Sequence, residues 1–265
     1  MPFFTIGMKP KKQFGQNFLT QPKIAQDIVN AGELSKKDTV IEIGPGKGML
    51  TEKILETGAK LIAIEKDADL ISGLNEKFEK EIKRGQLKIL NKDVRDLNVE
   101  ALGIKKYKLI ANIPYYITGE ILRTFLENKF QPEKMVLMVQ REVAERICAK
   151  NGKESILSIS VKIYGLPKII RRVSAGSFFP KPRVDSSVLM IEKISKDNFE
   201  KNKITEQHFF ELLKKGFKSP RKQLGPNLNF RKDEWYEICK KIEMDEKVRP
   251  ENLSVENWIS LSQHQ

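Results

Sequence analysis

Cysteine and histidine are scarce in this chain of 265 residues, which contains two of each. Cys148 and Cys239 are too few for a disulfide framework, and with only His208 and His264 beside them no Cys/His zinc cluster can form. The sequence therefore predicts a protein without a bound metal that works in a reducing compartment, the cytoplasm.

Long apolar runs are also missing. No stretch approaches the ~20 consecutive apolar residues that span a bilayer. The first ten residues lack the basic-then-apolar order of a secretory signal. Internal repeats and low-complexity tracts are absent as well. We therefore expect neither a membrane span nor a repeat architecture.

What the chain has in excess is positive charge, with 48 Lys and Arg against 35 Asp and Glu and a net charge of +13. Such an excess favours a polyanionic partner, either nucleic acid or an acidic membrane surface. A merely soluble basic protein is the alternative. Because 40% of the 265 residues are hydrophobic, the chain can form a packed core, with room for one large domain and a small appendage.

Between residues 39 and 191, short apolar runs alternate with amphipathic stretches, the pattern of strands joined by helical crossovers. Strands are expected at 40–43, 61–64, 87–90, 108–111 and 135–139, and helices at about 49–57 and 68–80. Two further strands, at 156–163 and 188–194, follow with little helix between them. The pattern predicts an α/β fold whose mostly parallel sheet carries an antiparallel pair at one edge.

The composition changes after Ile194. Residues 195–203 are polar and are expected to form a linker. Beyond them only helical patterns occur: Phe209 and Phe217 share one face, as do Trp235 and Ile242. We therefore predict two domains, an α/β domain over residues 1–194 and a small helical domain over residues 195–265.

A glycine-rich segment, Glu42-Ile43-Gly44-Pro45-Gly46-Lys47-Gly48, lies between the first strand and the first helix, where open α/β sheets bind nucleotides. Its Gly-x-Gly-x-Gly spacing differs from the Gly-x-Gly-x-x-Gly of dinucleotide sites, so a nicotinamide cofactor and a purely structural turn both stay open. Glu65 ends the second strand, where an acid accepts hydrogen bonds from ribose hydroxyls. Asp93 follows the third strand, and its carboxylate either receives an adenine amino group or caps the next turn.

Asn112-Ile113-Pro114-Tyr115, directly after the fourth strand, is the most specific motif. An exocyclic amino group on a base is a poor nucleophile because its lone pair is delocalised into the ring. The Asn112 side-chain oxygen and a neighbouring backbone carbonyl could accept both amino hydrogens, which would direct the lone pair at an electrophilic methyl group. Pro114 holds the turn without adding a competing donor, and Tyr115 offers a stacking face for a flipped base.

Two further segments suit the same chemistry. Residues 177–187, with Phe178 and Phe179 beside prolines and cations, fit base stacking and phosphate contact, or else form an ordinary proline-rich connection. Residues 13–19 are polar and aromatic. They could fold over the cofactor as a lid, or simply lead into a helix.

Taken in order, these segments make the chain resemble the ribosomal RNA adenine N6-dimethyltransferases, which use S-adenosylmethionine. The resemblance spans the first domain and continues into the tail. There it looks like the small-subunit branch, which dimethylates two adjacent adenosines near the 3′ end of small-subunit (16S) RNA. It is carried by residues 15–19, 42–46, 65–67, 112–115, 140–144, 178–182, 221–224 and 249–254.

The resemblance implies a Rossmann-like methyltransferase sheet that binds S-adenosylmethionine without a metal, and it implies a role for each site residue. Glu65 would hold the ribose, Asp93 the adenine, and Asn112 would border both the cofactor and the target base. Tyr115 and Phe178 would sandwich the flipped adenine. The implied cofactor-binding residues are Asn17, Leu19, Gly44, Gly46, Glu65, Asp93 and Asn112, and the implied catalytic residues are Asn112, Pro114, Tyr115 and Phe178.

The resemblance further implies an enzyme that binds small-subunit ribosomal RNA on the immature subunit, with a role in subunit biogenesis. We expect a monomer, because nothing in the sequence suggests an obligate partner. Two alternatives stay open. Gly46-Lys47-Gly48 looks like the related large-subunit enzymes that act on 23S RNA and confer antibiotic resistance. A non-catalytic RNA-binding assembly factor could also keep this fold.

The excess of positive charge lies mainly in the first domain. Residues 1–194 hold 34 basic and 23 acidic side chains, whereas residues 195–265 hold 14 and 12. Acid-free basic stretches occur at 162–183 and 212–232, with six and seven Lys or Arg. We expect these stretches to bind RNA, and the helical domain to fix orientation on the ribosomal particle. A membrane partner is disfavoured because no amphipathic anchor is present.

Overall fold

The computed structural model describes residues 10–11, 14–150 and 152–264. The chain forms two compact units, one of Met1–Ala144 with Lys168–Ile194 and one of Glu145–Pro167 with Ser195–Gln265. A boundary therefore falls at Ile194, where the composition changes. The second unit also takes in Glu145–Pro167, a segment that the sequence pattern assigned to the α/β domain.

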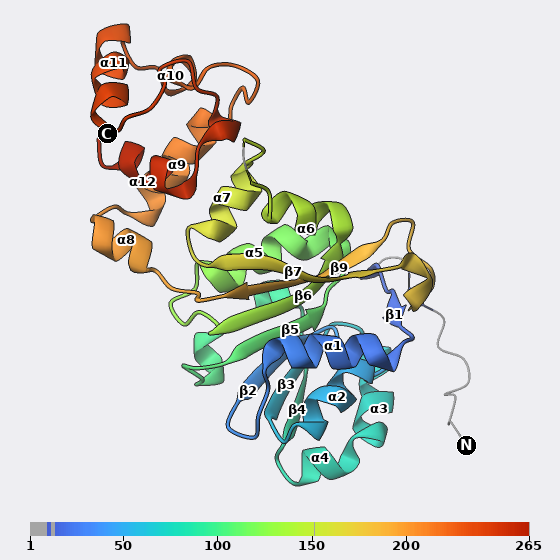
Figure 1. The fold of residues 1–265 in the computed structure, drawn as a ribbon. Helices are drawn as coiled ribbons and strands as arrows, with labels where there is room; N and C mark the ends of the chain where they lie inside the picture. Colours follow the sequence, from blue (N-terminus) through green and yellow to red (C-terminus); the bar gives the residue numbers. More distant parts are fainter. Residues whose placement is uncertain (1–9, 12–13, 151, 265) are drawn as a thin grey trace. The chain divides into compact units, whose positions relative to one another are not determined.

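Within the described residues, seven strands form one sheet in the order β4-β3-β2-β5-β6-β9-β7 (Figure 1). The neighbouring pairs among β2 to β6 are parallel, and β9 pairs antiparallel with β6. The predicted fold class is thus confirmed. The strands are β2 (Thr39–Ile43), β3 (Lys60–Glu65), β4 (Leu87–Asn91), β5 (Lys108–Asn112), β6 (Lys134–Gln140), β7 (Leu166–Val173) and β9 (Ser186–Glu192).

The strand order reverses next to β2. The chain runs outward from β2 through β3 to β4, and then returns to add β5 and β6 on the other side of β2. In the register of the sheet, Ile43 of β2 lies beside Ala111 of β5. The carboxyl ends of these two strands therefore meet at the switch point, which is where open α/β sheets bind ligands.

Helices cover the sheet because its strands are apolar on both faces. Ile28 of α1, Ile54 of α2 and Leu74 of α3 pack with Val40 and Leu61 of the strands into one buried cluster. Figure 1 shows these three helices together on one side of the sheet. The helices are α1 (Pro22–Gly32), α2 (Met49–Glu56), α3 (Ala68–Lys77), α4 (Glu79–Lys83), α5 (Thr118–Leu126) and α6 (Arg141–Ile147). The helix expected at 68–80 is broken at Phe78, whose φ of −114° is not helical.

The strand expected at 156–163 is wrong. These residues form helix α7 (Ile156–Lys162), which begins at a capping box in which the side chains of Ser155 and Ser158 each accept a hydrogen bond from the other's backbone N–H. The apolar residues alternate as in a strand, but Ile159 and Ile163 are four apart and both buried, as on one helix face.

The strand that the pattern missed is β7, which begins four residues after α7 ends. It contains Pro167 and several cations, which are unusual in a central strand. At the edge of the sheet they are tolerated, because one side of the strand makes no ladder and its side chains are alternately exposed.

Within the helical unit, α10 (Leu224–Leu228) and α12 (Val255–Ser262) pack on α9 (Glu206–Gly216). Trp258 of α12 is fully buried there, and a Cβ at Gly216 would lie 2.3 Å from its ring. Helix α11 (Lys232–Lys241) buries Trp235, as its periodicity predicts.

The predicted linker at 195–203 is not an open connection but contains helix α8 (Asp197–Asn202). Phe199 is buried, and its ring packs against those of Tyr164, Phe209 and Phe210. One aromatic side chain therefore anchors an otherwise polar segment.

No helix among the described residues is long and apolar enough to cross a membrane. Over the same residues, no group of three or more His, Cys, Asp or Glu side chains gathers as a metal site would require.

Candidate active site

A cavity opens at the carboxyl edge of the parallel strands and measures about 1040 Å³, counted out to the solvent at its mouth. The structure brings nine of the ten predicted site residues into its wall. They are Asn17, Leu19, Gly44, Gly46, Glu65, Asp93, Asn112, Pro114 and Tyr115. Phe178 is not among the lining residues. Residues 14–19 form one wall, as expected of a lid, whereas Gln13 lies outside the described residues.

The glycine-rich turn needs its glycines at the cavity. Gly44 has a φ of +67°, and a Cβ there would meet only a backbone oxygen at 3.7 Å, so the side facing the cavity is open. Gly46 has a φ of +58°, and a Cβ there would press on the ring of Phe18 at 3.0 Å. Both positions favour glycine, and together they let a ligand approach the backbone closely.

Glu65, at the end of β3, is 7% exposed and bonded to backbone on both carboxylate oxygens. One oxygen accepts from the N–H of Gly46 at 3.2 Å and the other from the N–H of Asp67 at 2.8 Å. Burial raises the pKa of this carboxyl above its ordinary value. Each oxygen keeps lone pairs for further donors, so the carboxylate can receive two hydroxyl groups of a ribose.

Asp93 serves as a cap and also lines the cavity. Its carboxylate accepts from the backbone N–H of Arg95 at 3.0 Å, and it pairs with the side chains of Arg95 at 2.7 Å and Lys66 at 2.8 Å. These cations hold the pKa of Asp93 well below its usual range. The carboxylate is therefore charged and fixed in position at the edge of the cavity.

Asn112 ends β5, and its amide has a defined orientation. Its nitrogen Nδ2 donates to the backbone carbonyl oxygen of Asn17 at 3.1 Å. Because a carbonyl oxygen can only accept, the nitrogen end of the amide must face Asn17. The oxygen Oδ1, at the other end of the amide, is left as an acceptor in the cavity wall.

Tyr115 begins the 3₁₀ turn Tyr115–Ile117. Its ring is held in place by its hydroxyl group. Its hydroxyl lies 2.6 Å from the Ser186 hydroxyl on β9, and burial raises the pKa of the phenol. Ser186 itself is fully buried. Sequence reasoning missed Ser186, because its partner is 71 residues away and no local pattern marks the pair.

Phe178 lies in the two-residue strand β8 (Phe178–Phe179), which pairs antiparallel with β1 (Phe18–Leu19). Phe178 pairs in register with Leu19. The Phe178 side chain is 4% exposed and lies within the hydrophobic core. The structure therefore buries the Phe178 ring in the core, outside the residues that line the cavity. Its neighbour Phe179 is 60% exposed.

Glu42, on β2 beneath the glycine turn, is a buried acid to which sequence reasoning gave no role. It is 1% exposed, and its only hydrogen bond in the described structure is to the Thr51 hydroxyl, which donates at 2.7 Å. Burial, with a smaller contribution from the nearby Glu65, raises the pKa of Glu42 to about 8. The group is therefore mainly protonated at neutral pH.

The Glu42→Gln variant is expected to become more stable than the wild type as pH rises. The folded wild type keeps a proton that the unfolded chain has released, so its free energy of unfolding falls between about pH 4.5 and 8. Glutamine mimics the protonated acid and does not show this pH-dependent loss of stability, which amounts to at most about 5 kcal/mol at pH 9. Urea unfolding at pH 5, 7 and 9 measures the difference. A constant difference across that range would contradict the assignment.

Comparison with known proteins identifies the family of this chain. The family described as "Ribosomal RNA adenine dimethylase" matches residues 7–264. The "Ribosomal RNA small subunit methyltransferase A" of Dehalococcoides mccartyi is 38% identical over 260 residues, covering 96% of this chain and 88% of the relative. Among solved structures, a dimethyladenosine transferase from Plasmodium falciparum superposes with a TM-score of 0.77 at 25% identity, covering 92% of this chain and 95% of that one. The 23S rRNA methyltransferase ErmE shares the fold with a TM-score of 0.74 at 20% identity, covering 94% and 99%.

The sheet, the glycine turn and the acid at the end of β3 form a nucleotide-type site, and together with these matches they place the chain among the methyltransferases that use S-adenosylmethionine as methyl donor. Within that class, the chain belongs to the ribosomal RNA adenine dimethylase family, which confirms the resemblance found in the sequence. The residues present fit the donor: Glu65 offers acceptors for its ribose hydroxyls, and Gly44 leaves room beside the backbone.

Proposed function

We propose that the protein dimethylates N6 of two adjacent adenosines near the 3′ end of small-subunit (16S) ribosomal RNA. The observation that carries the proposal is the fixed amide of Asn112, whose Oδ1 is presented beside the cavity that Glu65 borders. The relatives named as small-subunit methyltransferases support this choice of RNA. The likeness to ErmE is one of fold, and it gives the large-subunit alternative weaker support.

Asn112 acts on the amino group of the target adenine. S-adenosylmethionine, when bound, supplies a methyl group made electrophilic by its sulfonium. Oδ1 of Asn112 and a neighbouring backbone carbonyl accept the two amino hydrogens, which frees the nitrogen lone pair for attack. No strong base is needed, because the amino proton becomes acidic only after methyl transfer. Rate enhancement comes from positioning the two reactants in line and from the fixed polar groups around them.

The ring of Tyr115 stacks on the flipped adenine. Its hydroxyl contact with Ser186 keeps the ring in place, so that the stacking surface exists before RNA arrives. The resemblance assigns the opposite face of the base to Phe178. That role stays a prediction, because the ring is buried in β8.

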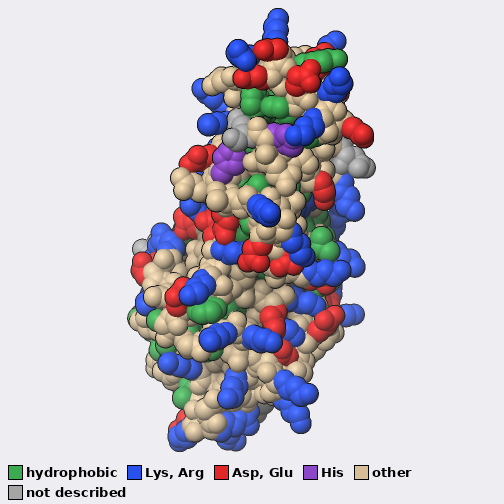
Figure 2. All heavy atoms as spheres, turned by 90° about the vertical axis from the view of Figure 1, so that its left-hand side faces the viewer, with side chains coloured by type: hydrophobic (Ala, Val, Ile, Leu, Met, Phe, Trp, Pro, Cys, Tyr) green, Lys and Arg blue, Asp and Glu red, His purple; other side chains and the backbone are tan. Residues whose placement is uncertain are grey.

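RNA binding is assigned to the basic stretches of both domains. On the face shown in Figure 2, Lys and Arg side chains are spread widely with acidic side chains between them. In the turn between α9 and α10, Lys218, Arg221 and Lys222 follow one another without an acid.

We assign methyl transfer to residues 1–194 and orientation on the immature small subunit to residues 195–265. In this proposal the protein acts as a monomer in the cytoplasm.

Mapping N6-dimethyladenosine in ribosomal RNA from cells with and without the protein tests the function. We expect the modification to disappear from two adjacent adenosines of small-subunit RNA and to return when purified protein is added to small-subunit particles. Loss of a large-subunit mark instead would identify the large-subunit alternative. An unchanged map, with no binding of S-adenosylmethionine by calorimetry, would identify a non-catalytic assembly factor.

The Tyr115→Ala variant is expected to lower kcat/KM for RNA by about 10- to 100-fold, since stacking on one base is worth roughly 1–3 kcal/mol. Tyr115→Phe keeps the ring and loses only the contact with Ser186, so its effect is a few-fold at most. Steady-state methylation with RNA as the varied substrate measures both. Tyr236→Ala, which removes an exposed tyrosine of the helical unit, is the control. Equal losses in the Ala and Phe variants would rule out stacking.

A further inference from the structure

The segment that precedes the sheet, residues 14–19 together with Lys11, forms a strap along the cavity and is fixed at three places. Its end pairs with β8 through Phe18 and Leu19. Its middle meets the active site, where the Asn17 carbonyl oxygen receives the Asn112 amide. Its beginning is tied to Asp67, just beyond the acid that ends β3.

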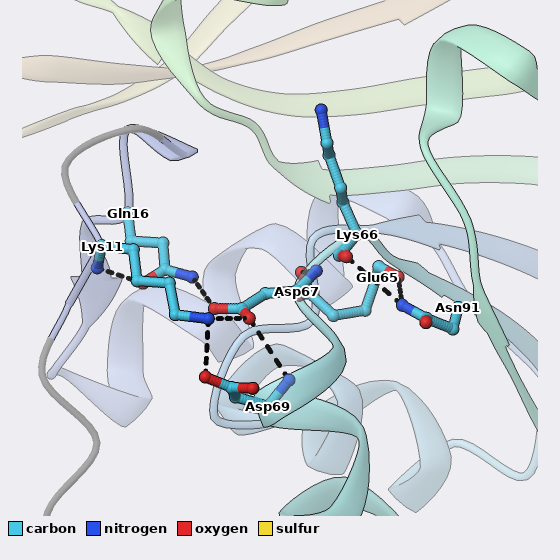
Figure 3. A network of polar contacts seen from close by, with 7 residues as sticks. All are labelled: Lys11, Gln16, Glu65, Lys66, Asp67, Asp69 and Asn91. Carbon is cyan, nitrogen blue, oxygen red and sulfur yellow. Dashed lines mark hydrogen bonds and ion pairs between the residues drawn. The ribbon is translucent and has the colours of Figure 1, made fainter.

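Figure 3 shows the network of polar contacts around Asp67, which is its most buried charged side chain. Both carboxylate oxygens of Asp67 accept hydrogen bonds from the strap. Its side chain is 4% exposed. One carboxylate oxygen accepts from Lys11 Nζ at 2.6 Å and the other from Gln16 Nε2 at 2.7 Å. The Lys11 ammonium also pairs with Asp69 at 2.6 Å, and the Lys11 backbone N–H donates to Gln16 at 2.7 Å.

The two polar anchors are close together in the strap. Gln16, held by Asp67, is followed directly by Asn17, whose carbonyl holds Asn112. The Asn17 side chain in turn donates to the Gly15 carbonyl at 3.1 Å, which stiffens the turn between them. A displacement of Gln16 therefore moves the Asn17 carbonyl, and with it the acceptor that orients the Asn112 amide.

We propose that Asp67 and Lys11 form a latch that positions Asn112 through the strap, so that the closed strap both covers the methyl donor and holds the catalytic amide. The proposal deepens the proposed function and rests on it for the role of Asn112. Asp67 touches neither reactant in this scheme, and it is a positioning residue.

Asp67 also has a structural role as the N-cap of α3, and a test of the latch must leave that role intact. Its carboxylate accepts from the Asp69 backbone N–H and caps α3. Asparagine caps a helix as well as aspartate does, so Asp67→Asn keeps the cap and removes the charge that Lys11 pairs with. Lys11→Met removes the same ion pair from the strap side, together with the pair to Asp69, and leaves the cap of α3 in place.

The experiment compares Lys11→Met, Asp67→Asn and the double variant, in the full chain, with Lys53→Met as control. Lys53 forms a 2.6 Å pair with Glu56 on α2, away from the strap. We expect each latch variant to speed amide hydrogen exchange in residues 14–19 and to lower kcat at saturating methyl donor about tenfold, as a small misplacement of a reacting group does. The double variant should lose less than the two singles added together. Both singles break the Lys11–Asp67 pair, whereas the pair with Asp69 is lost only with Lys11 and the contact with Gln16 is changed only at Asp67.

Calorimetry with S-adenosylhomocysteine adds a readout that is independent of methyl transfer, and we expect about tenfold weaker binding in the latch variants. Exchange rates like those of Lys53→Met would overturn the latch. Faster exchange with unchanged kcat would overturn the positioning of Asn112. If the wild type methylates no adenosine, the proposed function fails, whereas exchange and calorimetry still decide whether the latch exists.

Discussion

Replacing Asn112 with alanine is expected to lower kcat by about 10²- to 10³-fold and to leave RNA affinity unchanged, because the amide contacts the reacting nitrogen and not the RNA backbone. The amide is held by the Asn17 carbonyl before substrate binds, so the wild type does not have to order it during the reaction. Single-turnover methylation of small-subunit particles, with RNA binding measured separately, tests both parts of the expectation.

Two further variants make this test specific. Asn112→Asp preserves the shape but replaces the Nδ2 donor by an oxygen that repels the Asn17 carbonyl, so it should be nearly as inactive as Asn112→Ala. Asn30→Ala removes an exposed asparagine of α1 whose side chain, among the described residues, bonds only to Gln26, and the variant should behave as the wild type. Near-normal turnover in Asn112→Ala would remove Asn112 from the mechanism.

The central strands could be predicted because each is a short apolar run buried on both faces. Val40–Ile43 and Met135–Val139 satisfy this description, and the structure places both inside the sheet. The outer part of the sheet obeys different rules. Strand β7 is half exposed and carries Pro167, so its sequence only weakly indicates a strand. The alternating apolar residues of α7 indicated a strand where the structure has a helix. An edge strand is less buried than a central one, so its sequence needs fewer apolar residues and is harder to identify as a strand.

Several of the site residues that the sequence identified stand at or just after strand ends. Glu65 and Asn112 are the last residues of β3 and β5, so a correct strand was enough to place them at one edge. The latch could not be found in this way, because Lys11 and Asp67 are 56 residues apart in the chain. One local signal does mark Asp67, since it stands at the cap position before α3. Phe178 was predicted from the aromatic, proline and cationic residues around it and from the family resemblance, and neither shows which way a ring points.

The second large effect is expected at Glu65. Glu65→Ala should weaken binding of S-adenosylmethionine by about a hundredfold or more, because it removes two hydrogen bonds to a charged acceptor. Burial raises the pKa of this carboxyl, so protonation sets in above the usual range for glutamate. Affinity in the wild type should therefore decline as the pH is lowered into the mildly acidic range, since a protonated carboxyl has lost acceptor capacity.

Glu65→Gln separates the charge from the shape. One carboxylate oxygen faces the Gly46 N–H and the other faces the Asp67 N–H, so an amide nitrogen at either position meets a donor and the glycine turn loses an anchor. We expect Glu65→Gln to bind the methyl donor almost as weakly as Glu65→Ala, and its affinity should not decline further at acidic pH. The control Glu56→Ala removes a largely exposed acid of α2 and should keep both the wild-type affinity and its decline at acidic pH. Calorimetry with S-adenosylhomocysteine at pH 6 and 8 measures these affinities. Wild-type affinity in Glu65→Gln would show that Glu65 does not hold the ribose.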